Sequence, residues 1–380
     1  MSRELTDEEI LEMIDDLILS QNRNCYLSLQ QKHRLRRELF FAVRKMDVLQ
    51  ELLEDPEVTE IMVNGWQCIF VEKFGRIQKY DKKFTSEEKL YDVIQQIAAR
   101  CNRMINASHP IMDARLENGD RVSAVIAPVA LNGPILTIRR FSEKPVTLSR
   151  LVQWGSLSRE AAEYLITLVR GKYSILIGGS TGSGKSTLLG ALSGYIPREE
   201  RIITIEDNAE LQIQGIENLV RLEVKTANME GNQEITIRDL IKTSLRMRPS
   251  RVIVGEVRQE ESFDLIQCCN TGHMGSMSTL HANSTRDMVS RLEMMVLTGM
   301  DIPLEAIRKQ IAAGFDIFIH IGRMGDGSRK ILEIAEVTGY VQGEVRMQPL
   351  FQLKEQLIQV GELQDNERFC KAEEVYENRL

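Results

Sequence analysis

The sequence predicts an α/β protein in which a domain with a mostly parallel sheet follows a smaller α/β domain and an N-terminal helical segment. Three observations predict this fold class. From about residue 150, apolar runs alternate with amphipathic runs of helical spacing, as in parallel sheets covered by helices on both faces. A glycine-rich segment, "GGSTGSGKSTLLGALSG" at residues 178–194, lies between one such strand and one such helix. The length of 380 residues allows two or three domains.

Residues 1–50 are expected to form the polar helical segment. Thr6 and Glu9 make a capping box before "ILEMIDDLIL", whose apolar residues recur at helical spacing. A locally basic stretch, "QKHRLRRELFFAVRKM", follows at residues 31–46. A solvated helix face is the favoured interpretation of its charges, and contact with nucleic acid, lipid or a membrane partner is the alternative.

Residues 51–143 form the expected smaller α/β domain. Its strands are predicted at "VTEIMVNG" and "CIFVEKFGRIQKY", joined by a hairpin turn at Asn64-Gly65, and at "RVSAVIAPV" and "PILTIRRF". An amphipathic helix is predicted at "SEEKLYDVIQQIAARCNRM". Pro, Ser and Gly then break the pattern, so a linker is expected at residues 144–157.

Residues 158–355 form the expected larger α/β domain, and residues 356–380 a C-terminal tail. A helix at 159–171 leads to a strand at 173–177 and the glycine-rich segment. Further strands are predicted at residues 201–207, 219–224, 251–257 and 276–282, and further helices at residues 237–247, 261–269 and 285–297. A helix–strand pair through "IAAGFDIFIHI" and a terminal hairpin that turns at Gln342-Gly343 complete the domain.

Composition excludes several classes of protein. With 43% apolar and 27% charged residues, the chain is globular rather than disordered. A net charge of −7 argues against a protein that coats nucleic acid. The six cysteines are scattered without a C-x-x-C pair, which disfavours a zinc site or a disulfide framework and favours reduced thiols. No apolar run approaches the ~18 residues of a membrane span, and a signal-peptide pattern is missing, so we expect a cytoplasmic protein that reaches a membrane only through a partner.

Residues 179–186 match G-x-x-x-x-G-K-[ST], the phosphate-binding loop. Glycines let backbone N–H groups and the next helix N-terminus surround a β-phosphate, while Lys185 reaches the β- and γ-phosphates. A flexible Gly/Ser turn is the alternative, but it would need neither the lysine nor the hydroxyl that follows it. The predicted nucleotide-binding residues are Gly179, Ser180, Thr181, Gly182, Ser183, Gly184, Lys185, Ser186 and Thr187, with Ser186 as the ligand of Mg²⁺.

Carboxylates and histidines end the neighbouring predicted strands. "RIITIEDNAEL" ends a strand on Glu206 and Asp207, and "RVIVGEVR" ends another on Glu256. Because the carboxyl ends of parallel strands face the ligand crevice, these carboxylates are candidates to orient water or to lie near Mg²⁺. "NTGHMGSMSTLHANS" places His273 and His281 around a strand, with His281 where a γ-phosphate sensor could stand. Solvated strand-end charges and structural histidines are the alternatives.

Four segments, in this order and spacing, resemble the signature segments of the secretion ATPase superfamily, which serves type II secretion, type IV secretion and type IV pili. They are "GGSTGSGKST", "TIEDNAEL", "LRMRPSRVIVGEVR" and "TGHMGSMSTLHANS". Together with "DPEVTEIMVNG" and "DARLENGDRVSAVIAPVALNGPILTIRRF", they most resemble its CpaF-like branch, associated with Flp/Tad pili. The resemblance covers about residues 45–355 and implies a RecA-like ATPase domain.

The resemblance also implies a role for each matching residue. ATP phosphates and Mg²⁺ would contact Lys185 and Ser186. The implied catalytic set is Glu206 in the acidic box, Glu256 as the activator of water, His273 and His281 as the histidine box, and Arg115, Arg121, Arg139 and Arg140, which reach the phosphates, some of them from another subunit. The arginines would neutralise charge on the transferred phosphoryl group.

Some positions depart from the family's pattern. They are Met274, Met277 and Asn208, where we expect altered packing and retained hydrolysis. The tetracysteine metal site of type II secretion and pilus-extension members is missing, which favours the CpaF-like or conjugation-type branches.

The expected function is a cytoplasmic Mg²⁺-dependent ATPase, assembled as a homo-hexamer, that drives an inner-membrane platform protein in pilus assembly or secretion without direct contact to nucleic acid. Three alternatives belong to other classes: a nucleic-acid translocase, a non-hydrolysing nucleotide-gated scaffold and a small-molecule kinase. Acidic charge and the lack of aromatic residues interleaved with basic ones argue against the translocase. Retention of Glu206, Glu256 and His281 argues against the scaffold.

Overall fold

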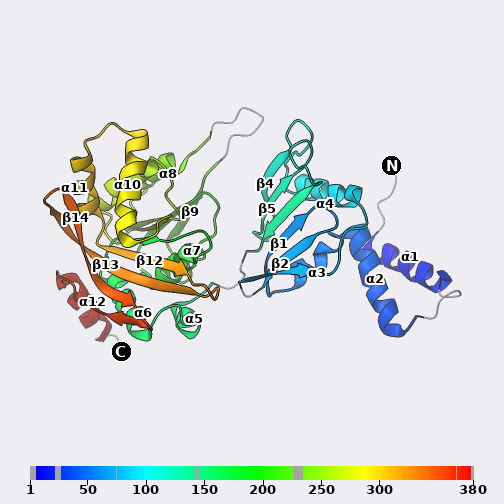
Figure 1. Cartoon of the computed structure of the whole chain (residues 1–380), viewed down its shortest axis with the longest axis horizontal. Helices are drawn as coiled ribbons and strands as arrows, with labels where there is room; N and C mark the ends of the chain where they lie inside the picture. The colour runs from blue at the N-terminus through cyan, green and yellow to red at the C-terminus, as the bar shows by residue number, and fades with distance from the viewer. Residues whose placement is uncertain are drawn as a thin grey trace. The chain divides into compact units, whose positions relative to one another are not determined.

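The computed structural model describes residues 6–21, 27–73, 75–141, 145–225, 234–364 and 366–377. The chain divides into two compact units, residues 1–143 and residues 144–380. Both units combine helices with a sheet, so the predicted α/β class is confirmed (Figure 1).

The first unit begins with a helical hairpin. Helix α1 (Asp7–Gln21) packs Ile10, Ile14 and Ile18 against α2 (Leu29–Arg44). The predicted capping box is present, since the backbone N–H of Thr6 donates to Glu9 Oε2 at 2.7 Å and that of Glu9 donates to Thr6 Oγ1 at 3.3 Å. Arginines of the basic stretch pair with carboxylates of the same unit: Arg34 with Glu38, Arg36 with Asp15, Arg37 with Glu54 and Arg44 with Asp7. Such pairing agrees with the solvated-face interpretation.

The rest of the first unit is an antiparallel sheet with one long helix. Its six strands are β1 (Val58–Asn64), β2 (Ile69–Lys73), β3 (Arg76–Tyr80), β4 (Ile111–Arg115), β5 (Arg121–Val125) and β6 (Ile135–Arg139), in the order β3-β2-β1-β6-β5-β4. Helix α4 (Glu87–Arg100) buries Leu90, Val93, Ile94 and Ile97 in the same core as the strands, joined by the short α3 (Leu49–Glu54).

Two sequence expectations for this sheet need correction. "CIFVEKFGRIQKY" was expected to be one strand, but it forms the hairpin β2–β3, in which Ile69 pairs with Tyr80 and Lys73 with Arg76. Gly75 has a φ of 74°, a conformation that favours a turn over a continuous strand. Strand β4 was not predicted, because its five residues alternate weakly and include Asp113 and Arg115. The hairpin after Asn64 was predicted, although its loop extends to Cys68.

The second unit carries a nine-stranded sheet. The order is β15-β14-β13-β12-β7-β11-β10-β8-β9, and the six strands from β12 to β9 run parallel, as expected. The parallel strands are β7 (Ile175–Gly178), β8 (Ile202–Glu206), β9 (Leu219–Glu223), β10 (Arg251–Val254), β11 (Met277–Leu280) and β12 (Ile317–Arg323). Antiparallel β13 (Arg329–Val341), β14 (Glu344–Leu353) and β15 (Leu357–Gln359) extend one edge. The predicted turn at Gln342-Gly343 joins β13 to β14.

Helices cover both faces of this sheet (Figure 1). On one face lie α5 (Leu148–Gln153), α6 (Arg159–Arg170) and α7 (Lys185–Ser193), and on the other α8 (Ile237–Ser244) with the 3₁₀ turn Leu245–Met247, α9 (Glu261–Asn270), α10 (Thr285–Gly299) and α11 (Leu304–Gly314). Strand β7 is buried from both sides, since Ile175 and Ile177 join one core and Leu176 the other. The sequence of a doubly covered strand is therefore continuously apolar.

Segments expected to be a linker and a tail contribute to the second unit. Residues 144–157 include α5 and bury Leu148, Leu151 and Leu157 in the core. Residues 356–380 include β15 and α12 (Glu367–Glu377), whose Phe369 lies 4.7 Å, centroid to centroid, from the ring of Tyr164 on α6. Across the described ranges, no helix has both the length and the apolar character to span a membrane.

Candidate functional site

The glycine-rich loop joins β7 to α7, and three of its glycines are required by geometry. Gly182 and Gly184 have φ values of 71° and 99°, which side chains rarely adopt. A Cβ on Gly179 would lie 2.3 Å from a backbone oxygen of β12 and 2.6 Å from Oγ of Ser183. The loop therefore holds a tight backbone turn directly before the N-terminus of α7, where free N–H groups and the helix dipole favour an anion.

The other loop residues divide into buried and open positions. Ser183 is fully buried, and its Oγ has no hydrogen-bond partner among the described residues. Ser180, Thr181, Ser186 and Thr187 are exposed. Hydroxyls of the first α7 turn are thus open to a ligand that sits on the loop.

Lys185, the first residue of α7, is folded back over the loop. Its Nζ donates to the backbone oxygens of Gly179 and Ser180, each at 3.1 Å, and lies 3.4 Å from Nδ1 of His281. The side chain is only 7% exposed, although an ammonium group is costly to bury. Two backbone oxygens accept from it here, and a phosphate would supply charged acceptors.

His281 connects Lys185 to Glu256. Burial lowers the pKa of His281 below 6.5, Glu256 raises it, and nearby cations, including Lys185 and Arg258, lower it further, so the ring is neutral near pH 7. In a neutral ring, Nδ1 accepts from the ammonium and Nε2 carries the proton. Nε2 lies 2.7 Å from Glu256 Oε1, but the two atoms are not aligned for a hydrogen bond, and Oε1 has no hydrogen-bond partner among the described residues.

The other oxygen of Glu256 is held by Arg258. Glu256 Oε2 accepts from Nη2 of Arg258 at 2.7 Å and from Nε at 3.0 Å, and Nη1 lies 3.3 Å from Asp207 Oδ2. Arg258 therefore orients the carboxylate through Oε2, and Oε1, beside His281, is left to accept from a ligand or a water molecule. Such an arrangement can position a water molecule for attack.

Glu206, at the end of β8, is a buried carboxylate with one oxygen to spare. It is 3% exposed, and its Oε2 accepts from the backbone N–H groups of Glu210 and Leu211, both at 2.8 Å. Oε1 has no hydrogen-bond partner among the described residues. Burial raises the pKa of Glu206, and the two N–H donors offset only part of that effect. An oxygen of this kind suits a cation or a hydrogen-bond donor brought by a ligand.

Adjacent parallel strands bring these groups together. In the sheet register, Gly178 of β7 pairs with Leu280 of β11, and Val254 of β10 pairs with Ile205 of β8. The loop, His281, Glu256 and Glu206 each follow the carboxyl end of one of these strands, so they share one edge of the sheet. Gly255 leaves room for the side chain of Glu206, since a Cβ on Gly255 would lie 3.0 Å from Cγ of Glu206.

His273 does not share this edge. It precedes β11, whereas His281 follows it, and its backbone oxygen accepts from Oγ of Ser276 at 2.7 Å. At ~3.3 Å per residue, the four residues of β11 alone separate the two histidines by about 13 Å. The expected pair of histidines is therefore split between the two ends of one strand. Of the residues that depart from the family pattern, Met277 is buried within β11 and Met274 is 45% exposed.

Three of the four candidate arginines form a row in the first unit. Arg121 on β5 pairs in register with Arg115 on β4 and with Arg139 on β6, so neighbouring strands place three cations on one face of the sheet. Like charges opposite each other destabilise a sheet, which makes this row a candidate anion site. Arg140 differs, because its Nη1 donates to the backbone oxygen of Asp55 at 2.5 Å within the same unit.

The carboxyl edge of the sheet, which carries the phosphate loop, is called the nucleotide edge. Two arginines at this edge were not predicted from the sequence. Arg258 lies in a segment quoted above for its glutamate, and its role becomes visible only from its contacts with Glu256 and Asp207. Arg329 begins β13, and its Nε donates to the backbone oxygen of Gly182 at 2.8 Å. No local pattern marks Arg329, since the antiparallel pairing of β12 with β13 brings it to the loop.

At this site a metal ion would need oxygen atoms from a bound phosphate compound in addition to those of the protein. Within the described ranges, no cluster of three or more His, Cys, Asp or Glu side chains could hold a metal. Mg²⁺ in phosphate-transfer sites binds through one or two protein oxygens together with substrate phosphates. The exposed Ser186 hydroxyl and the unpartnered oxygen of Glu206 fit that donor set.

A phosphate-binding loop at the carboxyl edge of a doubly covered parallel sheet defines a P-loop nucleotide-binding protein of RecA-like fold. A family model described as "Type II/IV secretion system protein" matches residues 43–319. The chain belongs to this family, the type II/IV secretion system ATPase superfamily.

Individual relatives agree with this assignment. A putative conjugal transfer protein of Mycobacterium tuberculosis is 33% identical over 295 residues, which cover 76% of this chain and 83% of that protein. Type IV secretion system protein VirB11 of Brucella suis is 32% identical over 303 residues, covering 73% and 84%. Among solved structures, the ATPase DotB of Yersinia pseudotuberculosis has a TM-score of 0.57 at 18% identity, covering 77% of this chain and 79% of that one. The pilus retraction motor PilT with bound ADP has a TM-score of 0.53 at 18% identity, covering 88% of each chain.

Proposed function

We propose that this protein is a Mg²⁺-dependent ATP hydrolase that works as a homo-hexameric ring at the cytoplasmic face of the inner membrane. Its hydrolysis would power Flp/Tad-type pilus assembly or protein secretion through a membrane platform protein. One observation carries the catalytic part of this proposal: the phosphate loop, His281, Glu256 and Glu206 gather at one edge of the sheet.

Binding of ATP would change the contacts of Lys185. The ammonium would exchange the backbone oxygens of the loop for phosphate oxygens, and backbone N–H groups at the start of α7 would hold the phosphates. Ser186, with Glu206 nearby, would hold Mg²⁺, whose positive charge would offset that of the phosphate oxygens. Glu256, held by Arg258 and next to His281, would orient the attacking water and accept its proton.

The arginine row would supply the remaining positive charge. Arg115, Arg121 and Arg139 share one face of a sheet in a unit of their own, so their approach to the nucleotide would require a specific arrangement of the two units or a neighbouring subunit. Neutralisation of the transferred phosphoryl group by arginine is worth roughly 10³–10⁵ in rate in other phosphoryl-transfer enzymes. Arg140, bonded to a backbone oxygen, is better suited to hold its own unit together.

The platform and pilus assignment is supported by the resemblance of the four signature segments to the CpaF-like branch. A nucleic-acid translocase is the second candidate, favoured by the relative named as a putative conjugal transfer protein. Against it stand the net charge of −7 and the internal ion pairs of the basic stretch on α2. Stimulation of ATP turnover by single-stranded DNA would favour the translocase.

Mass photometry with parallel ATP turnover tests the proposed function. The purified chain is measured with and without Mg²⁺ and a slowly hydrolysed ATP analogue, and turnover is recorded on the same sample. A hexamer that hydrolyses ATP only with Mg²⁺ is the expected result. A folded monomer that binds nucleotide without turnover would instead indicate a nucleotide-gated scaffold.

A further inference from the structure

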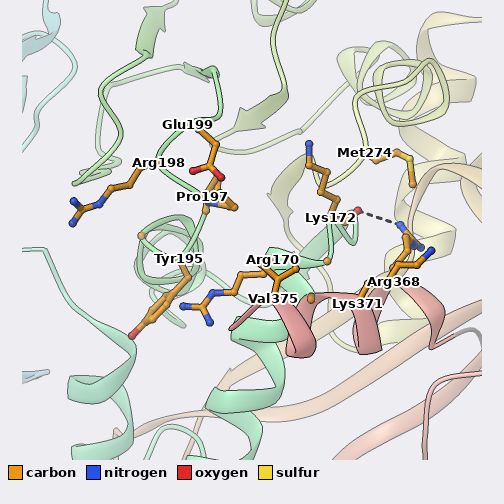
Figure 2. Close-up of a pocket in the computed structure, with 14 residues that line it drawn as sticks. Arg170, Lys172, Tyr195, Pro197, Arg198, Glu199, Met274, Arg368, Lys371 and Val375 are labelled. Atoms are coloured by element: carbon orange, nitrogen blue, oxygen red, sulfur yellow. Dashed lines mark hydrogen bonds between the residues drawn. The ribbon is translucent and has the colours of Figure 1, made fainter. Parts of the chain in front are cut away.

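A cleft of about 700 Å³ lies in the second unit, apart from the nucleotide edge. Its walls are the turn after α6, the connection from α7 to β8, and α12, so it opens at the amino ends of the strands (Figure 2). Tyr195 and Ile196 from the α7–β8 connection, Met274 from the segment before β11, and Ala372 and Val375 from α12 give it an apolar lining. Met274 is 45% exposed and Val375 is 56% exposed, which leaves apolar surface open to a partner.

Positive charge surrounds this apolar lining. The cleft is lined by five cationic side chains, Arg170, Lys172, Arg198, Arg368 and Lys371, and by a single carboxylate, Glu199 (Figure 2). Three of these cations pair with carboxylates outside the lining, Lys172 with Glu200, Arg368 with Asp316 and Lys371 with Glu367, so the excess of positive charge at the cleft is partial. An acidic partner with apolar side chains fits such a surface.

The cations of the cleft differ in how strongly carboxylates of the same chain hold them. Arg368 is committed to the fold, because it pairs with Asp316 and donates to the backbone oxygen of Lys172 at 3.1 Å. Lys371 pairs with Glu367 one turn away on α12, but their side chains are 69% and 73% exposed. Exposed pairs of this kind contribute little, so Lys371 can exchange its partner for another carboxylate.

The chain itself contains a helix with the complementary character. Helix α1 has six acidic residues, Asp7, Glu8, Glu9, Glu12, Asp15 and Asp16, and its sequence has no Lys or Arg. Its buried face packs on α2, yet Met13 and Leu17 on the outer side are 59% and 55% exposed. Glu12 and Asp16, next to them in sequence, are also exposed. Met13 and Leu17 are four residues apart and therefore form one apolar stripe edged by carboxylates.

We propose that α1 of one copy of this chain docks into the cleft of a second copy. Met13 and Leu17 bury against Val375, Met274 and Tyr195, while Glu12 and Asp16, which lie beside them, face the cationic rim. The docking goes beyond the proposed function, since it requires neither hydrolysis nor a membrane partner. It supplies a specific contact between copies that orders them head to tail, the kind of contact from which rings are built.

A labelled peptide of residues 7–21, titrated onto the full-length chain and followed by fluorescence anisotropy, tests this docking. We expect saturable binding that weakens by roughly tenfold or more in Lys371→Glu, because a favourable charge becomes repulsive. Arg198→Glu, on a different element, should weaken binding similarly even if α12 is disturbed by the first substitution. Lys354→Glu, an exposed lysine outside the cleft, is the matched control and should bind like the wild type.

Two altered peptides separate the charge and apolar contributions. A peptide with Glu12→Lys should bind Lys371→Glu better than the unaltered peptide does. A peptide with Met13→Ser and Leu17→Ser keeps every carboxylate and should lose most of its affinity. Equal binding of the wild-type peptide to Lys371→Glu, Arg198→Glu and wild type, or no binding to any of them, would overturn the proposal.

Cross-linking identifies which copy supplies the helix. A photo-reactive phenylalanine analogue replaces Leu17 in a ¹⁵N-labelled chain, which is mixed with unlabelled chain and irradiated. Cross-links from labelled α1 to unlabelled peptides that contain Tyr195, Met274 or Val375 are expected. Cross-links confined to one copy, or formed only outside the cleft, would contradict docking between copies. Binding of a fluorescent ATP analogue on the same samples reports separately on the nucleotide site.

Discussion

Two buried glutamates flank the same strand, β8, and their environments differ. Glu200, just before the strand, accepts from Arg251 Nη2 at 2.7 Å and Nε at 2.9 Å, with Lys172 Nζ at 3.5 Å. Burial raises the pKa of Glu200, but its bonds and charges from Arg251 and Lys172 outweigh burial and lower it overall. Glu206, the last residue of the strand, lacks such a pairing, and burial raises its pKa.

The difference separates a structural carboxylate from one prepared for a ligand. Arg251 is fully buried and also donates to a backbone oxygen of α6 at 2.6 Å, so the pair with Glu200 is complete within the fold. Glu206 keeps one oxygen without a partner among the described residues, at the edge that carries the phosphate loop. Glu200 is thus satisfied within the fold, whereas Glu206 has an oxygen left for a partner from outside.

The largest expected effect is a loss of ATP turnover when the ammonium group of Lys185 is removed. Lys185→Ala removes the ammonium that the loop holds over the phosphate position, and kcat should fall by at least about a hundredfold, with nucleotide affinity also reduced. Thermal unfolding should be unchanged or slightly improved, since a buried charge is lost. Turnover and binding of a fluorescent ATP analogue, compared with wild type, measure both. Retained turnover would remove Lys185 from the site.

A stability effect is expected at the opposite end of β8. Glu200→Gln leaves the guanidinium of Arg251 buried without its counter-charge, and the free energy of unfolding should fall by about 3 kcal/mol. The lowered pKa means that the pair stabilises the wild type above the unfolded-state pKa of about 4.5 and that this stability is lost as pH falls through the folded-state pKa.

Chemical denaturation at several pH values tests this prediction. The wild type and Glu200→Gln should differ most near pH 7 and converge in acid. Nucleotide binding should remain in both proteins, because Glu200 is remote from the loop. A stability difference that does not shrink in acid would contradict an ionic origin.

Glu206→Gln is expected to change the free energy of unfolding less than Glu200→Gln does, and in the opposite direction. The raised pKa means that Glu206 favours the folded state below its unfolded-state pKa and that this contribution is lost as pH rises through the folded-state pKa. Removing the charge should therefore raise the free energy of unfolding at pH 7, on the order of 1 kcal/mol, while turnover falls. Denaturation and turnover assays of the same preparation measure the two changes. A less stable variant would indicate that Glu206 is a structural carboxylate like Glu200.

Local sequence was sufficient for the phosphate loop and for the strand ends, because glycine spacing and apolar runs record backbone requirements directly. Gly179, Gly182 and Gly184 take up the close approach and the positive φ values that the motif implies. Glu206 and Glu256 follow buried strands, and the parallel register then brings them together.

Long-range packing decided what the sequence could not predict. Arg329 reaches the loop through pairing between β12 and β13, and Arg258 through contacts with residues of two other segments. His273 was grouped with His281 because both belong to one motif, yet a strand lies between them. The segments expected as linker and tail carry few local signals of structure, but leucines at 148, 151 and 157 and the strand β15 place them in the second unit.

The central claim is that the carboxyl edge of the sheet hydrolyses ATP with Glu256 as the residue that positions water. Glu256→Gln tests it most directly, because the amide keeps the size of the side chain and loses the ability to accept a proton. ATP affinity and single-cycle turnover are measured on wild type and variant with Mg²⁺ present. Retained ATP binding with hydrolysis reduced by at least about a hundredfold is the predicted result. Wild-type turnover by the variant would contradict the account.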